Sequence, residues 1–187
     1  HPTVSKSKIA FMHAGDLWVA NHDGSDVRRL TVNQAYETSP WFSPDGQWIA
    51  FTGNYDGNTD VYIVSVNGGM PKRLTYHHAG DNARGWSADG KSVIFSSVRY
   101  STTGRYSRLY SVGVDGGLPQ AFSMPMAERG SFSPLGDRIA YTMLRDPFNT
   151  WKRYRGGQHP FVWLFDMQSH EVEEVPTAGR ANDTSPI

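Results

Sequence analysis

Residues 40–51, PWFSPDGQWIAF, decide the fold, because they place a tight turn between two short apolar strands. Residues 43–46, Ser-Pro-Asp-Gly, occupy the four positions of a type I turn in the order that such a turn favours. The apolar residues on either side of the turn cover the length of an ordinary strand. The stretch therefore predicts a β-hairpin.

The hairpin returns twice, as GWSADGKSVIF at residues 85–95 and as SFSPLGDRIAY at residues 131–141. The three turns begin at residues 43, 87 and 133, so the repeat is 44 and then 46 residues long. A repeat of this length made of short strands is typical of a β-propeller. The sequence therefore predicts an all-β fold, a β-propeller of four-stranded antiparallel blades. No helix is predicted, because the apolar residues alternate with a period of two.

Residues 1–187 are predicted to form an incomplete propeller of about four blade-equivalents. The first blade is expected to lack its first strand, and the closing NDTSPI matches YETSPW at residues 36–41. The chain is therefore expected to be a segment of a larger propeller. The alternative is a homo-oligomer in which the last strand of one copy completes the open blade of another. The predicted blades are residues 8–31, 38–75, 83–122 and 129–175, followed by the first strand of a next blade at residues 184–187.

The composition excludes several classes of protein. Lysine and arginine together number 18, as do aspartate and glutamate, so there is no basic excess for general binding of nucleic acid or anionic membranes. The chain has no cysteine, which excludes disulfides, thiol catalysis and zinc-thiolate sites. No apolar run approaches the roughly 20 residues of a membrane span, so no membrane insertion is expected. The compartment stays open between periplasm and cytoplasm, with an extracytoplasmic location favoured.

The connections between the strands divide into two groups. In a four-stranded meander, the turns after the first and third strands lie at one end of the blade, and the other connections lie at the opposite end. The tight Ser-Pro-Asp-Gly and Asp-Gly-Gly turns belong to the first group, and the irregular loops belong to the second. Loops of variable length on a rigid frame are where binding sites usually lie, so partner contacts are expected at the second end.

The longest loop, residues 144–160, has a basic character. Connections longer than about 12 residues inside a compact domain are often functional. Arginine binds carboxylates through two parallel hydrogen bonds, so a peptide C-terminus or an acidic loop of a neighbouring domain is the expected partner. The alternative is a staple between blades or domains, with Trp151 and Tyr154 buried and the arginines paired locally. The candidate peptide- or partner-binding residues are Arg145, Lys152, Arg153, Tyr154 and Arg155.

Other constellations carry weaker signals. Residues 56–60, DGNTD, resemble the start of a calcium loop but lack the distal bidentate glutamate. His77 and His78 with Asp81 are candidate metal ligands, but adjacent side chains on a strand point apart and no third ligand is fixed nearby. No G-x-S-x-G nucleophile elbow and no phosphate-binding loop before a helix is present. The sequence therefore predicts no catalytic residue, no metal and no cofactor.

The repeat P-x-W/F-S-P-D-G, followed by I-A-F, D-V-Y and R-L-T, resembles the TolB-like propeller repeat over nearly the whole chain. WKRYRGG at residues 151–157 resembles bacterial tricorn-type peptidases, as do VSKSKIAFMHAGDLWV, GNYDGNTDVY and NDTSP. The resemblance implies the first part of an N-terminal propeller. In that family, two propellers precede a PDZ domain and a serine-peptidase core, the catalytic residues lie in the C-terminal part, and the proteins form large homo-oligomers.

The resemblance also implies a role beside an active site rather than in it. The N-terminal propeller of the family is thought to act as a conduit or filter for peptides. Archaeal members carry a basic pair after the second repeat, proposed to hold the C-terminus of the substrate. Here the matching loop, residues 77–84, has Arg84 as its only arginine or lysine, which weakens a role in holding the substrate C-terminus.

Three hypotheses follow for the function. The first is a non-catalytic propeller segment of a tricorn-like serine peptidase, which gates or positions peptides and supports assembly. Its partners would be peptide substrates or neighbouring domains of the same protein. The second is a stand-alone interaction propeller like TolB. The third is a propeller polysaccharide lyase, which needs convergent His, Arg and carboxylate residues with a metal; His77, His78 and Arg84 are the only candidates nearby.

Overall fold

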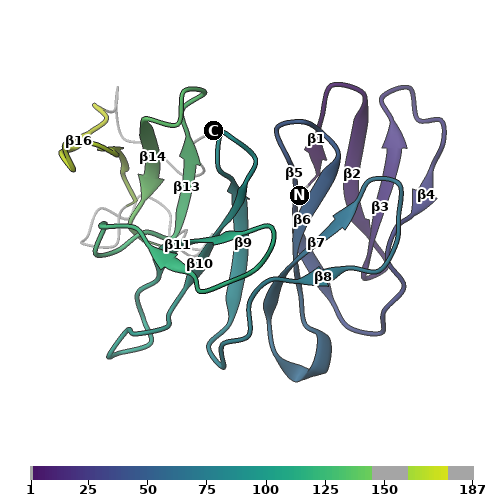
Figure 1. Cartoon of the computed structure of the whole chain (residues 1–187), viewed down its shortest axis with the longest axis horizontal. Helices are drawn as coiled ribbons and strands as arrows, with labels where there is room; N and C mark the ends of the chain where they lie inside the picture. The colour runs from purple at the N-terminus through teal and green to yellow at the C-terminus, as the bar shows by residue number, and fades with distance from the viewer. Residues whose placement is uncertain (1, 145–159, 177–187) are drawn as a thin grey trace, which may run out of the picture.

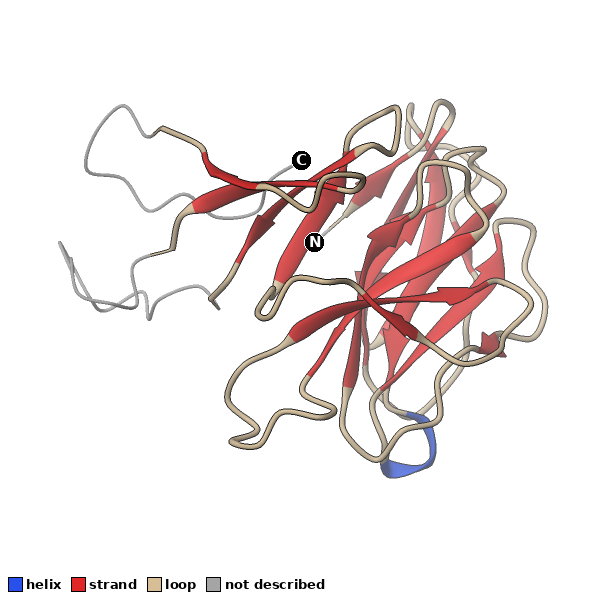
Figure 2. Cartoon of the chain, turned by 60° about the vertical axis from the view of Figure 1, so that its left-hand side comes forward, coloured by secondary structure: helices blue, strands red, loops and turns tan. Residues whose placement is uncertain are grey.

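The computed structural model describes residues 2–144 and 160–176. These residues form four antiparallel sheets of four strands each, in which every strand pairs with its neighbour in sequence. The sheets stand side by side as blades (Figure 1), which confirms the all-β propeller fold. The only helical element in this part of the chain is a single 3-10 turn, η1 (Tyr55–Gly57), blue in Figure 2.

The strand bounds follow the predicted repeat. Sheet one contains β1 (Thr3–Val4), β2 (Lys8–His13), β3 (Asp16–Asn21) and β4 (Arg28–Arg29). Sheet two contains β5 (Glu37–Phe42), β6 (Trp48–Gly53), β7 (Asp60–Ser65) and β8 (Lys72–Arg73). Sheet three contains β9 (Asp81–Trp86), β10 (Ser92–Ser97), β11 (Arg108–Gly113) and β12 (Gln120–Ala121). Sheet four contains β13 (Arg129–Phe132), β14 (Arg138–Thr142), β15 (Val162–Asp166) and β16 (Val172–Glu174).

Sheet one corrects the prediction for the first blade, which was expected to lack its first strand. β1 pairs with β2 through Thr3 opposite Ala10 and Val4 opposite Ile9. The turn between them is closed by the Ser5 amide, which donates to the Lys8 carbonyl at 2.8 Å. The sequence concealed this strand, because it is two residues long and its turn lacks the Ser-Pro-Asp-Gly signature.

Each pair of neighbouring sheets encloses its own apolar cluster. In sheet two the strands alternate: Phe51 packs toward sheet one, and Ala50 packs toward sheet three. A third cluster around Ile139 and Tyr141 joins sheets three and four. Burying one large apolar side chain stabilises a fold by about 1.5–3 kcal/mol, so these three clusters hold the array together.

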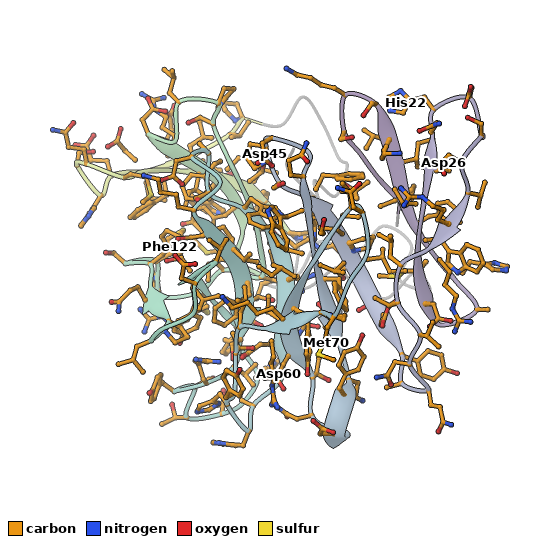
Figure 3. All side chains as sticks on the ribbon, turned by 45° about the vertical axis from the view of Figure 1, so that its right-hand side comes forward. His22, Asp26, Asp45, Asp60, Met70 and Phe122 are labelled. Carbon is orange, nitrogen blue, oxygen red and sulfur yellow. The ribbon has the colours of Figure 1, made fainter. Side chains whose placement is uncertain are left out.

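The molecule has two chemically different ends, referred to here as the turn end and the loop end. The turns after the first strand of each sheet gather at the turn end, which is the upper edge in Figure 1. The connections β6–β7, β8–β9 and β10–β11 extend from the lower edge, which is the loop end. In Figure 3, Asp45 marks the turn end and Asp60 marks the loop end.

At the turn end, the glycine that closes each turn packs against the turn of the preceding sheet. Gly46, Gly90 and Gly136 have φ angles of 70°, 70° and 74°, a left-handed conformation that glycine adopts without strain. In each turn the glycine amide donates to the serine carbonyl three residues earlier, which confirms the predicted turns. A Cβ atom on Gly136 would lie 3.2 Å from the Cβ of Ala88 in sheet three. The repeated glycine is therefore required by both backbone conformation and packing.

Replacing Gly136 with alanine is expected to cost more stability than the same change at Gly24. Gly24 also has a left-handed φ, 82°, but no atom lies within 4 Å of the position that a Cβ on Gly24 would take. The conformational strain of about 1–2 kcal/mol is common to both variants, and crowding against Ala88 should add about 1 kcal/mol at Gly136 only. Urea unfolding of the two variants measures the difference, and equal losses would contradict the contact between the turns.

Two predicted segments lie outside the described residues. These are the loop segment 145–159 and the C-terminal segment 177–187, which includes the predicted strand 184–187. The exchange of that strand between copies therefore stays a prediction. Within residues 2–144 and 160–176, the structure contains no helix long and apolar enough to cross a membrane.

Candidate functional site

The loop end combines exposed aromatic rings with ion pairs that lie beneath them. Tyr36, Tyr76 and Tyr100 are 80%, 73% and 86% exposed, and they come from the β4–β5, β8–β9 and β10–β11 loops. The guanidinium group of Arg73 lies 4.6 Å from the ring centre of Tyr76. That of Arg105 lies 5.6 Å from the ring of Tyr106. These exposed rings and cations are contact groups typical of binding surfaces.

His77 and His78 lie together on this end, which corrects the expectation that their side chains point apart. Their ring centres are 4.2 Å apart and their planes are inclined by 32°. The pair lies in the β8–β9 loop, where the alternation of a strand does not apply. The Nδ1 atom of His77 accepts a hydrogen bond from the Ala79 amide at 3.0 Å, and the His77 carbonyl accepts one from Asn58 at 2.7 Å. His77 is thus part of the loop's own hydrogen bonding.

This environment lowers the pKa of His77 below its ordinary value of 6.5, through partial burial first, then Arg99 and His78. Asp81 and Asp60 act in the opposite direction on the same pKa. Because the unfolded chain then binds a proton at a higher pH than the folded chain, stability should fall as the pH drops through 6.5. NMR titration of the wild type and of His77→Gln tests the lowered pKa of His77. The imidazole signal with the low pKa should be missing from the variant. A His77 signal that titrates above 6.5 would contradict it.

Beneath the exposed rings, sheets one and two repeat the same ion pair. Asp16 pairs with Arg29 at 2.5 Å, and Asp60 pairs with Arg73 at 2.6 Å. In both sheets the aspartate begins the third strand and the arginine ends the fourth. The hydroxyl of the threonine two residues after each arginine accepts a hydrogen bond from a backbone amide of the third strand. The distance is 2.9 Å in sheet one and 3.0 Å in sheet two. These bonds fasten the short outer strand to its sheet.

Other carboxylates join one sheet to the next. Glu37 begins β5 of sheet two but accepts hydrogen bonds from Leu17 at 3.0 Å and Thr31 at 2.5 Å, both in or beside sheet one. Burial raises the pKa of Glu37. Glu128, before β13, accepts from Ser107 and from Arg84 of sheet three, both at 2.5 Å. The loop end is therefore held rigid where the sheets meet.

Asp81 and Arg99 form the most deeply buried of the described ion pairs. Asp81 is fully buried, and the Arg99 side chain is 7% exposed. Arg99 Nη2 donates to the Asp81 carboxylate, and its guanidinium lies over the rings of Phe95 and Tyr110 at 5.1 and 5.4 Å. Burial raises the pKa of Asp81 against the opposing effect of Arg99. The pair joins the start of β9 to the base of the β10–β11 loop.

The described carboxylates beneath the exposed rings already have hydrogen-bonding or ion-pair partners. The carboxylates of Asp16, Glu37, Asp60 and Glu128 are all engaged by donors from their own or neighbouring sheets. Asp60, the last residue of the calcium-like stretch, also accepts from Asn58 at 2.9 Å. Within residues 2–144 and 160–176, no three metal-ligating side chains are grouped as a metal site requires.

The predicted peptide- or partner-binding residues stay a prediction. Arg145, Lys152, Arg153, Tyr154 and Arg155 lie outside the described residues, in the connection between β14 and β15. Arg84, the single basic residue of the 77–84 segment, lies in β9 and donates to Ser96 at 2.9 Å as well as to Glu128. The Arg84 side chain is therefore committed to joining sheets three and four, which further weakens a role in holding a peptide carboxylate.

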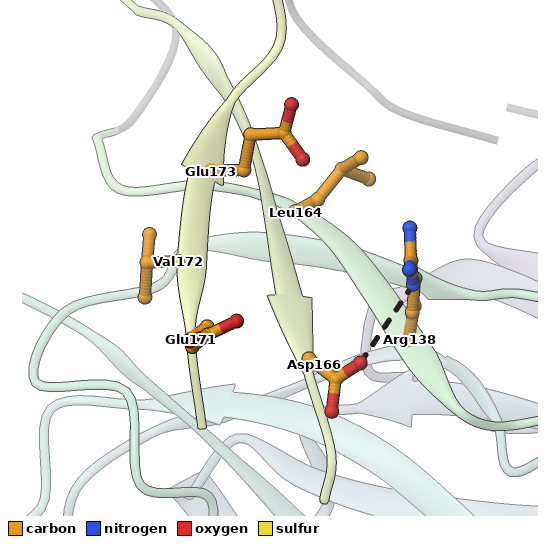
Figure 4. A pocket seen from close by; sticks show the side chains of 6 residues that line it. All are labelled: Arg138, Leu164, Asp166, Glu171, Val172 and Glu173. Atoms are coloured by element: carbon orange, nitrogen blue, oxygen red, sulfur yellow. Dashed lines mark ion pairs between the residues drawn. The ribbon is translucent and has the colours of Figure 1, made fainter. Parts of the chain in front are cut away.

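A hollow of about 350 Å³ lies on the face of sheet four that points away from sheet three. Figure 4 shows Leu164 in it, beside Arg138 and Asp166, whose charged groups are 3.8 Å apart. Leu164 lies opposite Ala140, as Ile63 lies opposite Ala50 in sheet two, and Ile63 is covered by sheet three. The hollow therefore corresponds to a face on which sheets pack, and we interpret it as a packing surface rather than a ligand site.

The ion pairs beneath the exposed rings were not predicted from the sequence. The signal was present, because aspartate and arginine are 13 residues apart in both sheet one and sheet two, at 16 and 29 and at 60 and 73. Sheet three departs from this pattern, since Arg108 stands where the aspartate would be and donates to the carbonyls of Met124 and Phe122. No sequence pattern points to Arg99, which lies two residues beyond β10, the strand that pairs with the strand beginning at Asp81.

The chain matches the tricorn protease N-terminal β-propeller domain family over residues 1–187. It is 33% identical over 164 residues to Tricorn protease homolog 1 of Streptomyces coelicolor, which covers 83% of this chain and 14% of that protein. It is 38% identical over 66 residues to the Tol-Pal system protein TolB of Desulfosudis oleivorans, which covers 33% of this chain and 15% of that protein. The chain thus spans a small part of the length of these relatives.

Solved structures share the fold. The crystal structure of the tricorn protease superposes with a TM-score of 0.83 at 22% identity, covering 100% of this chain and 19% of that one. TolB from Acinetobacter baumannii gives a TM-score of 0.71 at 22% identity, covering 96% and 44%. Oligogalacturonate lyase in complex with manganese gives 0.65 at 12% identity, covering 92% and 51%. At these identities the likeness shows the fold alone.

Proposed function

Because the chain belongs to the tricorn protease N-terminal β-propeller family, we propose that it is a non-catalytic propeller segment of a tricorn-like serine peptidase. In this proposal the loop end gates or positions peptides beside an active site that other parts of the protein supply, and the propeller supports assembly. The observation that carries the proposal is the loop end itself. It presents exposed tyrosines and cations above carboxylates that are already engaged.

The strands that flank the basic segment 145–159 bring the chain to the same end of the molecule on either side of it. Residues 145–159 connect β14, which ends at Thr142, to β15, which begins at Val162, and both of these strand ends face the loop end. The four cations of this segment would add carboxylate-binding groups to the aromatic surface. The expected ligand is therefore a peptide with a free C-terminal carboxylate, or an acidic loop of a neighbouring domain.

The binding experiment compares fluorescein-labelled peptides that differ only in a free or an amidated C-terminus. Arg153→Ala with Arg155→Ala should weaken binding of the free-carboxylate peptide, measured by fluorescence polarisation. Exposed arginine pairs contribute up to about 1 kcal/mol each, so the loss should be modest. The matched control is Lys72→Ala with Lys91→Ala, which removes two cations at other positions and should leave binding unchanged.

Two outcomes would contradict the proposal. Unchanged peptide binding in the arginine variant, together with lost stability, would identify the loop as a structural staple instead. The chain is also expected to show no peptidase activity, so clear activity abolished by a serine inhibitor would refute the non-catalytic role. A TolB-like interaction propeller is the second candidate, supported by the similarity to TolB over 66 residues. It predicts binding to a folded partner protein without preference for a free carboxylate.

A further inference from the structure

A cleft of about 310 Å³ opens at the turn end, among the first strands of sheets two, three and four. Its walls include Trp41, Trp86 and Phe132, and its rim includes Pro44 and Pro134. The volume is at the lower end of the roughly 300–1,000 Å³ that ligand pockets occupy. This cleft lies away from the loop end and plays no part in the function proposed above.

The cleft exists because one position of the repeat has lost its side chain. In sheet two, Trp41 lies opposite Ala50 and packs into the apolar cluster between sheets two and three. In sheet three the equivalent residue is Gly85, which lies opposite Ile94 on the face toward sheet four. No atom lies within 4 Å of the position that a Cβ on Gly85 would take. Sheet three therefore carries no side chain at the position that Trp41 takes in sheet two, and Gly85 lines the cleft instead.

The groups around this space define the chemistry of an occupant. Arg84 is the charged residue of the lining, and it is engaged by Glu128 at 2.5 Å and by Ser96 at 2.9 Å. The hydroxyl groups of Ser87 and Ser133 donate to aspartates of their own turns, at 2.6 and 2.5 Å. The cleft therefore offers aromatic faces and no uncommitted charge, which favours an uncharged aromatic group. It is also continuous with the apolar interface between sheets three and four.

The neighbouring interface also indicates a hydrogen bond for the occupant. The Trp41 indole donates from Nε1 to the carbonyl of Ala83, at 3.3 Å. Ala83 lies opposite Phe95, and Gly130 lies opposite Tyr141 at the equivalent position of sheet four. Gly130 lines the cleft. Its carbonyl thus stands where the acceptor for an indole N–H would be expected.

We propose that this cleft is a binding site for a tryptophan side chain presented by a peptide or a partner protein. The bound indole would take the place beside Gly85 that Trp41 takes one interface earlier. Phe132, which packs toward sheet three from sheet four, would contact its ring, and the Gly130 carbonyl would accept its N–H. The turn end would then carry a recognition site of its own, independent of peptide binding at the loop end.

The test uses N-acetyltryptophanamide, an uncharged indole probe, and maps its binding by amide chemical shifts of the full chain. A dissociation constant on the order of 1 mM is expected for so small a ligand. The shifts should centre on Gly85, Trp86 and Gly130. N-acetylleucinamide, the matched aliphatic probe, should bind at least about fivefold more weakly, because it lacks the ring and the N–H donor.

Two variants localise the site. Phe132→Leu keeps an apolar side chain but removes one aromatic wall, and it should weaken probe binding about threefold or more. Tyr76→Leu, at the loop end, should leave it unchanged. Three outcomes would each overturn the proposal. They are chemical-shift changes confined to the loop end, equal binding of both probes, and no shift change at the highest soluble probe concentration. Because the mapping is performed on the wild type, a folding defect in Phe132→Leu would not remove the test.

Discussion

Replacing Arg99 with methionine is expected to lower the free energy of unfolding at pH 7 by about 3–5 kcal/mol. The change leaves the Asp81 carboxylate fully buried without the guanidinium that neutralises it. It also removes the cation that lies over the rings of Phe95 and Tyr110. Urea unfolding at pH 7, followed by circular dichroism, measures the loss.

The pH dependence distinguishes this mechanism from a simple packing defect. Burial already raises the pKa of Asp81 in the wild type, and removal of Arg99 should raise it further. Below that raised pKa the Asp81 side chain is protonated and neutral, so the deficit of the variant should shrink as the pH falls. Adding Asp81→Asn to Arg99→Met should likewise restore part of the lost stability at pH 7.

The matched control is Arg138→Met in sheet four. Arg138 and Asp166 are 3.8 Å apart, with side chains that are 55% and 32% exposed. Exposed pairs of this kind are worth about 1 kcal/mol or less. A loss at Arg99 no larger than the loss at Arg138 would mean that the buried pair contributes little, and the rigid base of the β10–β11 loop would need another explanation.

The repeat made the fold predictable, because local turn chemistry and strand alternation agreed in sheets two, three and four. Residues 43–46 and their two copies determine where one strand ends and the next begins, and Gly24 and Gly116 close the outer hairpins with left-handed φ angles. β1 escaped prediction because a two-residue strand has no periodicity. Its hairpin with β2 is closed by a turn that lacks the Ser-Pro-Asp-Gly signature.

The candidate site was less predictable than the fold. The choice of the loop end followed from topology, and the exposed tyrosines support it. The interactions of Arg99 and Arg84 could not be predicted, because their carboxylate partners are 18 and 44 residues away in sequence. The cleft beside Gly85 depends on an absent side chain, which is visible only when the strands are aligned by their pairing register.

Replacing Phe95 with alanine is expected to cost about 3–5 kcal/mol, since it opens a cavity in a packed interface. Phe95 is fully buried in the cluster between sheets two and three, and its ring stacks on Tyr110 with centres 5.5 Å apart. Phe95→Leu keeps most of the volume and should cost less than about 1.5 kcal/mol. Tyr100→Ala, which truncates an exposed aromatic side chain in the β10–β11 loop, should stay within about 0.5 kcal/mol.

Phe95 also supports the ion pair, so the two large effects should not be additive. The Arg99 guanidinium lies 5.1 Å from the Phe95 ring centre, and residues in such contact commonly show coupling energies of about 0.5–3 kcal/mol. The double variant Phe95→Ala with Arg99→Met should therefore lose less stability than the two single losses combined. Urea unfolding measures the losses, provided that the slope of the free energy against urea concentration is unchanged. Strictly additive losses would contradict this prediction. They would mean that the interface between sheets two and three and the loop-end ion pair behave as separate units. In a stacked array each sheet depends on its neighbours, so coupling here would link the order of the loop end to the packing of the interface beneath it.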